Sequence, residues 1–270
     1  MDGGPIIATP WDTPPETGAA TEVAPGILWL RLPLPMVLDH VNIYALDEGD
    51  SWTIVDTGIQ SKRSVALWED ILSGPLQGRP VRRVILTHHH PDHIGMAGWL
   101  MARFGAELWA SRTSWLMARM LILDVEDSPT PQALAFSRAG GMDPEIYEAR
   151  KAERPYNFSD ICAPIPVGYT RIQEGDVIRA GGYDWDVRMG GGHAPEHVVL
   201  PGHKLPFTGL PFRMQQLRDN HHGALDRLRT FLATPRTAAE CFPLLFKRQI
   251  DRGTYGLALV EAIAHLNHLL

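Results

Sequence analysis

The chain is 270 residues long, enough for one α/β domain of ordinary size and a small appendage, and its 44% hydrophobic residues supply a core. A formal net charge of −6 argues against a protein whose main partner is nucleic acid. The two cysteines give no disulfide framework, and no apolar stretch approaches the roughly 18 residues that a membrane span needs. The N-terminus lacks the basic start and apolar run of a secretory signal, so we expect a soluble, cytoplasmic protein.

The first part of the chain predicts an extension, then strands, then a helix. Residues 1–24 are rich in Pro, Thr and Gly and are expected to wrap the surface or stay mobile. Short apolar runs separated by turn residues predict a β-meander at 27–32, 41–46 and 52–55. A helix is expected at 61–72, with its apolar residues on one face and Ser61 as its cap.

Strand and helix alternate in the segment that follows. The apolar run 81–86 predicts a strand, and apolar residues at helical spacing from Ile94 onward predict a helix that ends near Phe104. A further short strand is expected at 107–110. This alternation indicates an α/β layer arrangement.

The second half begins with helices, returns to strands and ends in helices. Residues 112–166 contain a Met-rich helical stretch and then short helices that Pro and Gly separate. The strands expected next, at 169–172, 176–179 and 183–189, lead into three consecutive glycines that let a backbone approach a ligand closely. The last helices are expected at 213–232, 235–246 and 257–270.

The run THHHPDHIG, residues 87–95, places three imidazoles and a carboxylate in an H-x-H-x-D-H pattern directly after an apolar strand. In an extended backbone, side chains two apart lie on the same face, so His88 and His90 can reach one ion together. A proline then ends the extended segment, and Asp92 and His93 at the start of the next helix can turn toward a second ion. A surface histidine cluster would need neither the aspartate at this offset nor a buried strand before it, so the pattern indicates a metal site.

This pattern is the signature of the metallo-β-lactamase superfamily, which the chain resembles over about residues 25 to 210. The run WTIVDTG, residues 52–58, resembles the family strand that ends in Asp-Thr-Gly. The resemblance implies that its aspartate, Asp56, supports the metal ligands through hydrogen bonds without being a ligand. A strand-end aspartate that merely caps a turn is the plainer interpretation of Asp56 taken alone.

Two further motifs lie downstream. The run GGHAPEH, residues 191–197, resembles the third family motif, in which His193 would complete the ligands of the first metal. The run LPGH, residues 200–203, resembles the last motif, in which His203 would bind the second metal. The resemblance therefore implies a first ion held by His88, His90 and His193, and a second ion held by Asp92, His93 and His203.

The resemblance also implies the fold. We expect an α/β protein built as a four-layer αββα sandwich with a small helical C-terminal subdomain. The expected division is an N-terminal extension (1–24), a metallo-β-lactamase-like domain (25–212) and a helical, winged-helix-like tail (213–270). Residues 112–166 take the position of a family insertion that arches over the metals, which favours a lid bearing the substrate pocket. A helix pair merely packed on the sheet is equally compatible, because methionines fill cores as readily as pockets.

One feature departs from the family pattern. Nine residues separate His193 from His203, a span of at most about 30 Å, where the family has a strand, a Gly-Asp whose carboxylate bridges the metals, a loop and a helix. No aspartate lies between His193 and Asp219. Either the bridging carboxylate is absent, or the natural chain carries a further segment of several tens of residues here. We favour the second, because a deletion through two core elements should have destroyed the sheet while the Pro-Gly-His motif remains family-like.

The expected cofactor is a pair of divalent ions, with zinc favoured and iron or manganese compatible. Between two cations a water loses a proton near neutral pH, and the resulting hydroxide would attack a carbonyl group. Asp92 would be both a ligand and the acceptor that orients this water. His197 is given a minor weight as a substrate contact, and Glu196 is poorly aimed to replace the missing bridge. His221 and His222 are expected on the surface.

These observations favour a metal-dependent hydrolase of a small carbonyl substrate, namely a thioester, a lactone or another ester, without a membrane partner and with nucleic acid disfavoured. One alternative is an RNA or phosphodiester hydrolase, because some superfamily members with a similar helical tail process RNA. The other is a degenerate single-metal or non-catalytic scaffold, if the bridging aspartate is absent. Substrate identity, native metal and oligomeric state are left open.

Overall fold

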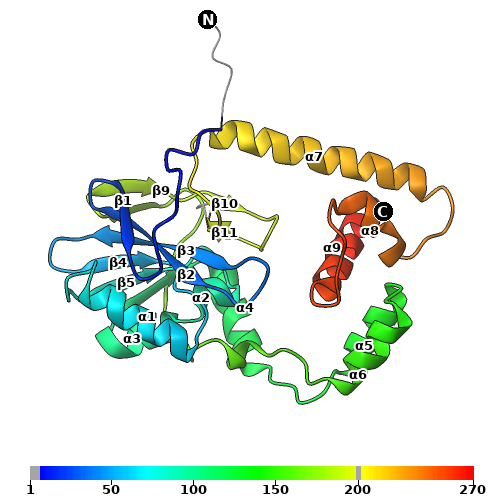
Figure 1. Ribbon diagram of the computed structural model, residues 1–270, viewed down its shortest axis with the longest axis horizontal. Helices are drawn as coiled ribbons and strands as arrows, with labels where there is room; N and C mark the ends of the chain where they lie inside the picture. The colour runs from blue at the N-terminus through cyan, green and yellow to red at the C-terminus, as the bar shows by residue number, and fades with distance from the viewer. Residues whose placement is uncertain (1–6, 199–201) are drawn as a thin grey trace, which may run out of the picture. The chain divides into compact units, whose positions relative to one another are not determined.

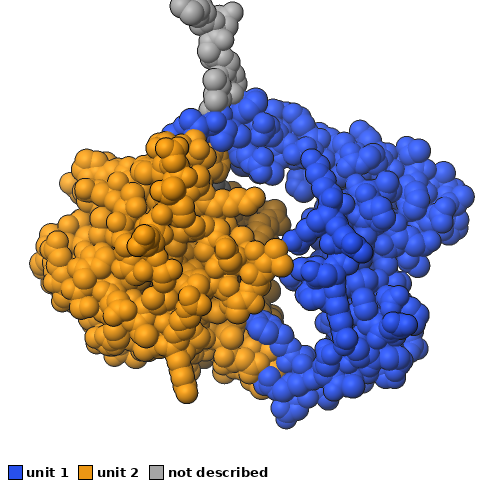
Figure 2. Space-filling view, viewed as in Figure 1, with its two compact units in different colours: residues 1–8, 126–156, 208–270 blue, residues 9–125, 157–207 orange. Residues whose placement is uncertain are grey.

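The computed structural model describes residues 7–198 and 202–270, which form two compact units. Unit 2 comprises residues 9–125 and 157–207, and unit 1 comprises residues 1–8, 126–156 and 208–270 (Figure 2). The metal motif and the central sheet lie in unit 2. No helix among the described residues has both the length and the apolar character to cross a bilayer.

Unit 2 is built on a seven-stranded sheet whose strands follow the chain order (Figure 1). The first four strands pair antiparallel as a meander, and the last four pair parallel. The carboxyl ends of parallel strands meet at one edge of a sheet, so loops that follow them are brought together there. The strands are β1 (Ala20–Ala24), β2 (Ile27–Pro33), β3 (His40–Asp47), β4 (Trp52–Val55), β5 (Val81–Ile85), β6 (Glu107–Ala110) and β7 (Thr170–Arg171).

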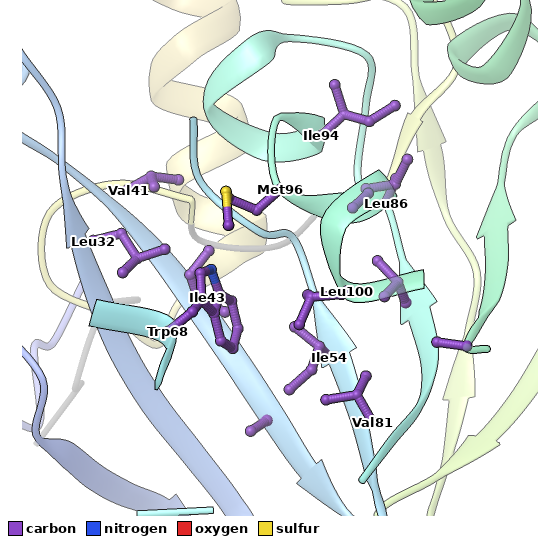
Figure 3. Packing of buried hydrophobic residues seen from close by; sticks show 14 of the residues in the cluster. Leu32, Val41, Ile43, Ile54, Trp68, Val81, Leu86, Ile94, Met96 and Leu100 are labelled. Atoms are coloured by element: carbon purple, nitrogen blue, oxygen red, sulfur yellow. The ribbon is translucent and has the colours of Figure 1, made fainter. Parts of the chain in front are cut away.

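Helices cover one face of this sheet and enclose the main hydrophobic core. In Figure 3, Trp68 from α1 and Leu100 from α3 lie among apolar side chains of the strands, such as Ile43 and Ile54. The side chain of Ser61 accepts a hydrogen bond from Ser64 N and caps α1, as its position in the sequence predicts. The helices of this unit are α1 (Lys62–Ser73), α2 (Pro91–Ile94), α3 (Ala97–Phe104), α4 (Arg112–Leu123) and the short 3₁₀ helix η1 (Phe158–Asp160).

Four short strands lie beyond the other face of the sheet: β8 (Val177–Ala180), β9 (Tyr183–Asp186), β10 (Met189–Gly190) and β11 (His197–Val198). They pair as two separate two-stranded sheets, β8 with β9 and β10 with β11. A second apolar cluster packs between them and the central sheet. This layer is incompletely filled, because an apolar cavity of about 230 Å³ lies against Tyr44, Val55, Ile85 and Trp185.

Unit 1 is helical. Its apolar cluster joins residues of the segment 126–156, such as Met142 and Tyr147, to C-terminal residues such as Phe242 and Leu259. The backbone N–H of Asp143 also donates to the hydroxyl of Tyr255 at 3.1 Å. The helices are α5 (Pro131–Ala139), α6 (Pro144–Ala152), α7 (Leu210–Phe231), η2 (Ala239–Cys241), α8 (Phe242–Leu245) and α9 (Tyr255–His268).

The mixed α/β fold with a helical C-terminal region is confirmed, with several local differences from the sequence prediction, among them the division of the strand expected at 183–189 into β9 and β10. The end of the expected extension forms β1, which pairs with β2 across a turn at Gly26, a residue with φ +73°. The second tail helix begins later than expected because Thr237 and Glu240 bond each other as a capping box. Residues 112–166 divide between the units, because the apolar side chains of 126–156 pack on the C-terminal helices. The lid role and the domain boundaries stay predictions.

Gly98, on the buried side of α3, provides a test of this packing. A Cβ atom there would lie 2.1 Å from the carbonyl oxygen of Pro164, a backbone atom that cannot rotate away. We expect Gly98→Ala to lower the free energy of unfolding by roughly 1–3 kcal/mol, measured by urea denaturation. Gly168→Ala is the matched control, since a Cβ there meets nothing within 4 Å. Equal stability of the two variants would contradict the packing described.

Candidate metal centre

The loop after β5 carries the histidine motif, and the chain changes there from extended backbone to helix at Pro91. His90 has an extended backbone (φ −63°, ψ 147°), and Pro91 then takes the first position of α2, where its missing N–H costs no hydrogen bond. His88 and His90 therefore end the extended segment, whereas Asp92 and His93 belong to the first turn of the helix. The two halves of the motif therefore contribute to two different groups of potential ligand atoms.

His88, His90 and His193 form the first group. The Nε2 atom of His88 lies 3.0 Å from Nδ1 of His90, which lies 3.1 Å from Nε2 of His193. Two nitrogens bound to one tetrahedral zinc ion are about 3.3 Å apart, as follows from Zn–N distances near 2.0–2.1 Å. The three nitrogens therefore fit one ion with an adjustment of a few tenths of an ångström.

Asp92, His93 and His203 form the second group. Oδ2 of Asp92 lies 3.3 Å from Nε2 of His93 and 3.5 Å from Nε2 of His203. Nε2 of His93 is buried and has no hydrogen-bond partner among the described residues. An orphaned ring nitrogen beside a carboxylate and a second imidazole is the environment that a bound cation would satisfy. The two groups share no member, and Asp92 is the one carboxylate that either contains within the described chain.

Asp56 connects the two groups through hydrogen bonds. Its carboxylate is 1% exposed, and its Oδ2 atom lies 2.8 Å from Nδ1 of His93 and accepts a hydrogen bond from the hydroxyl of Thr87 at 2.8 Å. That hydroxyl lies 3.0 Å from Nδ1 of His88. Because the hydroxyl donates to Asp56, it must accept from His88, and so Nδ1 carries the ring proton. Nε2 of His88 is then left with its lone pair at the first group.

The imidazoles of the first group are held neutral. Burial, reinforced by neighbouring imidazoles, lowers the pKa of His88 far below its usual value and lowers the pKa of His90 to about 4. Burial is also the main cause of the lowered pKa of His193. Neutral rings keep the lone pairs that bind metal.

The second group is charged. Burial opposes the ionisation of Asp92, but the neighbouring ring of His93, 3.3 Å away, outweighs it and lowers the pKa of this carboxyl to about 2. Burial likewise opposes the protonation of His93, yet the adjacent Asp56 carboxylate raises the pKa of this imidazole above its usual value. The ring of His93 therefore lies, protonated, between two carboxylates.

Both groups border a cavity of about 180 Å³, which His197 also lines. Nδ1 of His197 lies 3.0 Å from the carbonyl oxygen of Ala194. Its ring passes close to Gly190, where a Cβ would lie 2.6 Å from the ring carbon Cε1. From the sequence alone His197 is a minor candidate for a substrate contact, and the run of glycines before it is the signal that a ring packs there.

Glu196 and His89 belong to neither ligand group, although the ring of His89 lies beside that of His90 with centroids 4.8 Å apart. The Oε2 atom of Glu196 accepts a hydrogen bond from the backbone N–H of Thr113 at 3.1 Å, so this carboxylate is held at the first turn of α4. That contact agrees with the expectation that Glu196 does not replace a bridging carboxylate. His89 is buried with an unpartnered Nδ1 atom among the described residues, and His221 and His222 are exposed on α7.

Comparisons with known proteins agree with this geometry. The family model described as "Metallo-beta-lactamase superfamily" matches residues 36–204, and the model described as "Metallo-beta-lactamase-like, C-terminal domain" matches residues 225–270. The crystal structure of a beta-lactamase domain protein from Burkholderia ambifaria is 32% identical, with a TM-score of 0.83, over 97% of this chain and 91% of that one.

Two curated relatives match shorter parts. A probable metallo-hydrolase, YqjP, from Bacillus subtilis is 34% identical over 71 residues, which are 26% of this chain and 22% of that protein. The hydroxyacylglutathione hydrolase GloC from Haemophilus influenzae is 24% identical over 167 residues, which are 60% of this chain and 62% of that protein. The matches thus span less than two thirds of these two relatives. The family models and the Burkholderia structure, in contrast, cover most of the chain, including every motif of the two ligand groups, and the chain belongs to the metallo-β-lactamase superfamily.

Proposed function

We propose that this metallo-hydrolase binds two divalent ions, zinc by preference, and hydrolyses a small thioester, lactone or other ester. The observation that carries the proposal is the pair of adjacent three-residue ligand groups on the wall of one cavity. A cavity of about 180 Å³ suits the reacting end of a small substrate. The name of one relative, hydroxyacylglutathione hydrolase, supports an acyl substrate.

The roles of the residues follow from their protonation. His88, His90 and His193 are neutral and would hold the first ion through their lone pairs. Asp92 is ionised, so it would serve the second ion and accept a hydrogen bond from the water that attacks the carbonyl carbon. The bound ions would supply the Lewis acidity that acidifies this water and polarises the carbonyl group.

Asp56 would keep the ligands aimed. Its carboxylate fixes the ring of His93 directly and that of His88 through Thr87. Because both rings are already oriented, metal binding would not have to order them. His197 lines the same cavity and would contact the substrate. The chain's acidic charge favours a small molecule over an RNA backbone.

The function is tested first by removing the metal and one ligand. We expect EDTA treatment and His90→Ala each to lower the rate of hydrolysis of a panel of thioesters, lactones and aryl esters by at least about 100-fold. Added zinc should restore the activity of the EDTA-treated protein but not that of the His90→Ala variant. His222→Ala, an exposed histidine on α7, is the control and should keep full activity. Elemental analysis should find close to two ions per chain.

Activity that survives both treatments would contradict the proposal. One ion or none per chain, together with no turnover, would instead favour a degenerate scaffold. Cleavage of RNA with binding that falls steeply as salt rises would favour the phosphodiester alternative.

The two ligand groups should also differ in the pH dependence of metal binding. An ion that binds Nε2 of His93 must displace the proton from that nitrogen, which the carboxylates of Asp56 and Asp92 favour, so lowering the pH favours the protonated, metal-free form. Between pH 6 and 8 we expect the affinity of the second site to rise about tenfold per pH unit. The first site should change little above pH 6.5, because its imidazoles are already neutral there.

Isothermal titration calorimetry in two buffers with different ionisation enthalpies counts the protons released by each ion. Asp56→Asn keeps the shape of the side chain but removes the charge that raises the pKa of His93, and it should flatten the pH dependence of the second site. Equal proton release at both sites of the unaltered protein would contradict the protonation states described.

A further inference from the structure

The segment 202–204, which carries His203, is hydrogen-bonded along the first residues of β3. The backbone N–H of Asn42 donates to the carbonyl oxygen of Gly202 at 2.7 Å, and Nδ2 of Asn42 donates to the carbonyl oxygen of Lys204 at 2.9 Å. In return, the backbone N–H of Lys204 donates to Nε2 of His40 at 2.7 Å. The strand β4 pairs with the later residues of β3, from Tyr44 to Asp47, so this segment bonds to β3 before the start of that pairing.

The same strand fixes the ring of His203. Nδ1 of His203 lies 2.9 Å from the carbonyl oxygen of His40, and a carbonyl oxygen can only accept. Nδ1 therefore carries the ring proton, and Nε2 presents its lone pair 3.5 Å from Oδ2 of Asp92. A ring with its other nitrogen tied to a backbone carbonyl has both its orientation and its tautomer set for metal binding.

The two residues of β3 are themselves held in place. Asn42 is 1% exposed, and its Oδ1 atom accepts a hydrogen bond from the indole N–H of Trp29 at 2.9 Å. Because the backbone N–H of Lys204 can only donate, Nε2 of His40 is unprotonated and the ring proton sits on Nδ1, 2.5 Å from the carboxylate of Asp39. The orientations that serve the segment 202–204 are thus set by its surroundings in β2 and β3.

The segment 202–204 has little conformational freedom. Lys204 has φ +62°, a left-handed conformation that is unfavourable for a non-glycine residue, and its hydrogen bonds to His40 and Asn42 hold it there. On the other side, a Cβ at Gly202 would lie 2.9 Å from the ring carbon Cε1 of His93. The segment is therefore confined between β3 and a ligand of the second group.

We propose that His40 and Asn42 are positioning residues of the second metal site, which hold His203 in its ligand geometry from β3. The inference rests on the proposed function, because it presumes that this site takes a divalent ion. The bonds to β3 supply the support for this ligand, because Nδ1 of His203 and the backbone of both its neighbours, Gly202 and Lys204, are hydrogen-bonded there. Neither residue belongs to the two ligand groups.

The test measures zinc binding by the whole chain in competition with a chromophoric chelator, which gives a separate Kd for each ion. His40→Phe keeps a ring of similar size but removes the acceptor for Lys204 N–H, and Asn42→Asp keeps the acceptor for Trp29 but removes the donor to the Lys204 carbonyl. We expect each variant to raise the Kd of the second ion about 10–100-fold and to leave the first ion within a factor of about three.

Two further variants show whether the effect is specific. His40→Gln places an amide oxygen where Nε2 lies and should restore the second ion to within a few-fold of the unaltered protein. His222→Ala, an exposed histidine on α7, is the control and should leave both ions unchanged. Near-UV circular dichroism of each variant reports whether the fold is retained.

Unchanged binding of the second ion in both His40→Phe and Asn42→Asp overturns the proposal. Equal weakening of both ions also overturns it, because that result assigns the two residues to general folding. If the unaltered protein itself holds fewer than two ions, the proposed dinuclear function fails and this inference fails with it. Two ions in the unaltered protein, combined with an unchanged Kd of the second ion in the variants, refutes the role of β3 and leaves the dinuclear function standing.

Discussion

The arrangement of this site depends on one buried carboxylate. Asp56 follows β4 with φ +61°, and its side chain accepts hydrogen bonds from the backbone and the hydroxyl of Thr87 while it pairs with His93. A buried carboxylate without such partners would cost several kcal/mol, so these groups are ordered together or not at all. Through Thr87 the same carboxylate sets the tautomer of His88. One side chain therefore organises ligands from both groups before any ion arrives.

The two ligand groups differ in their charge and protonation. Three imidazoles with nitrogens about 3 Å apart cannot all be protonated, so burial and mutual repulsion leave them neutral. His93 instead lies beside Asp56 and Asp92, and a proton there compensates the two buried negative charges. A divalent cation bound there, as proposed, would take over this compensation.

Chemistry and scaffold are supplied by different parts of unit 2. The parallel strands β4 and β5 bring Asp56 and the loop of residues 88–93 to one edge of the sheet, whereas the antiparallel strand β3 binds His203. The short strands of the second β layer leave an apolar cavity of about 230 Å³ against the sheet. Thr87 and Val198 line both that cavity and the histidine-lined one, and the N–H of Val198 donates to the carbonyl oxygen of Thr87 at 2.8 Å. A backbone hydrogen bond therefore links the wall of the ligand site to the second β layer.

The sequence by itself determined what is local: apolar periodicity placed most strands and α1, and the spacing of H-x-H-x-D-H predicted that two sets of ligands would diverge at Pro91. It also indicated Asp56, His193 and His203, through motifs that resemble those of the metallo-β-lactamase superfamily. Only the tertiary structure decided the pairing of β1, the packing of residues 126–156 with the C-terminal helices, the contact of Glu196 with α4, and the bonds of His40 and Asn42 to the segment 202–204. Those contacts join residues as far as 164 positions apart, and hydrogen bonds across such distances depend on how the chain folds back on itself, which no local pattern encodes.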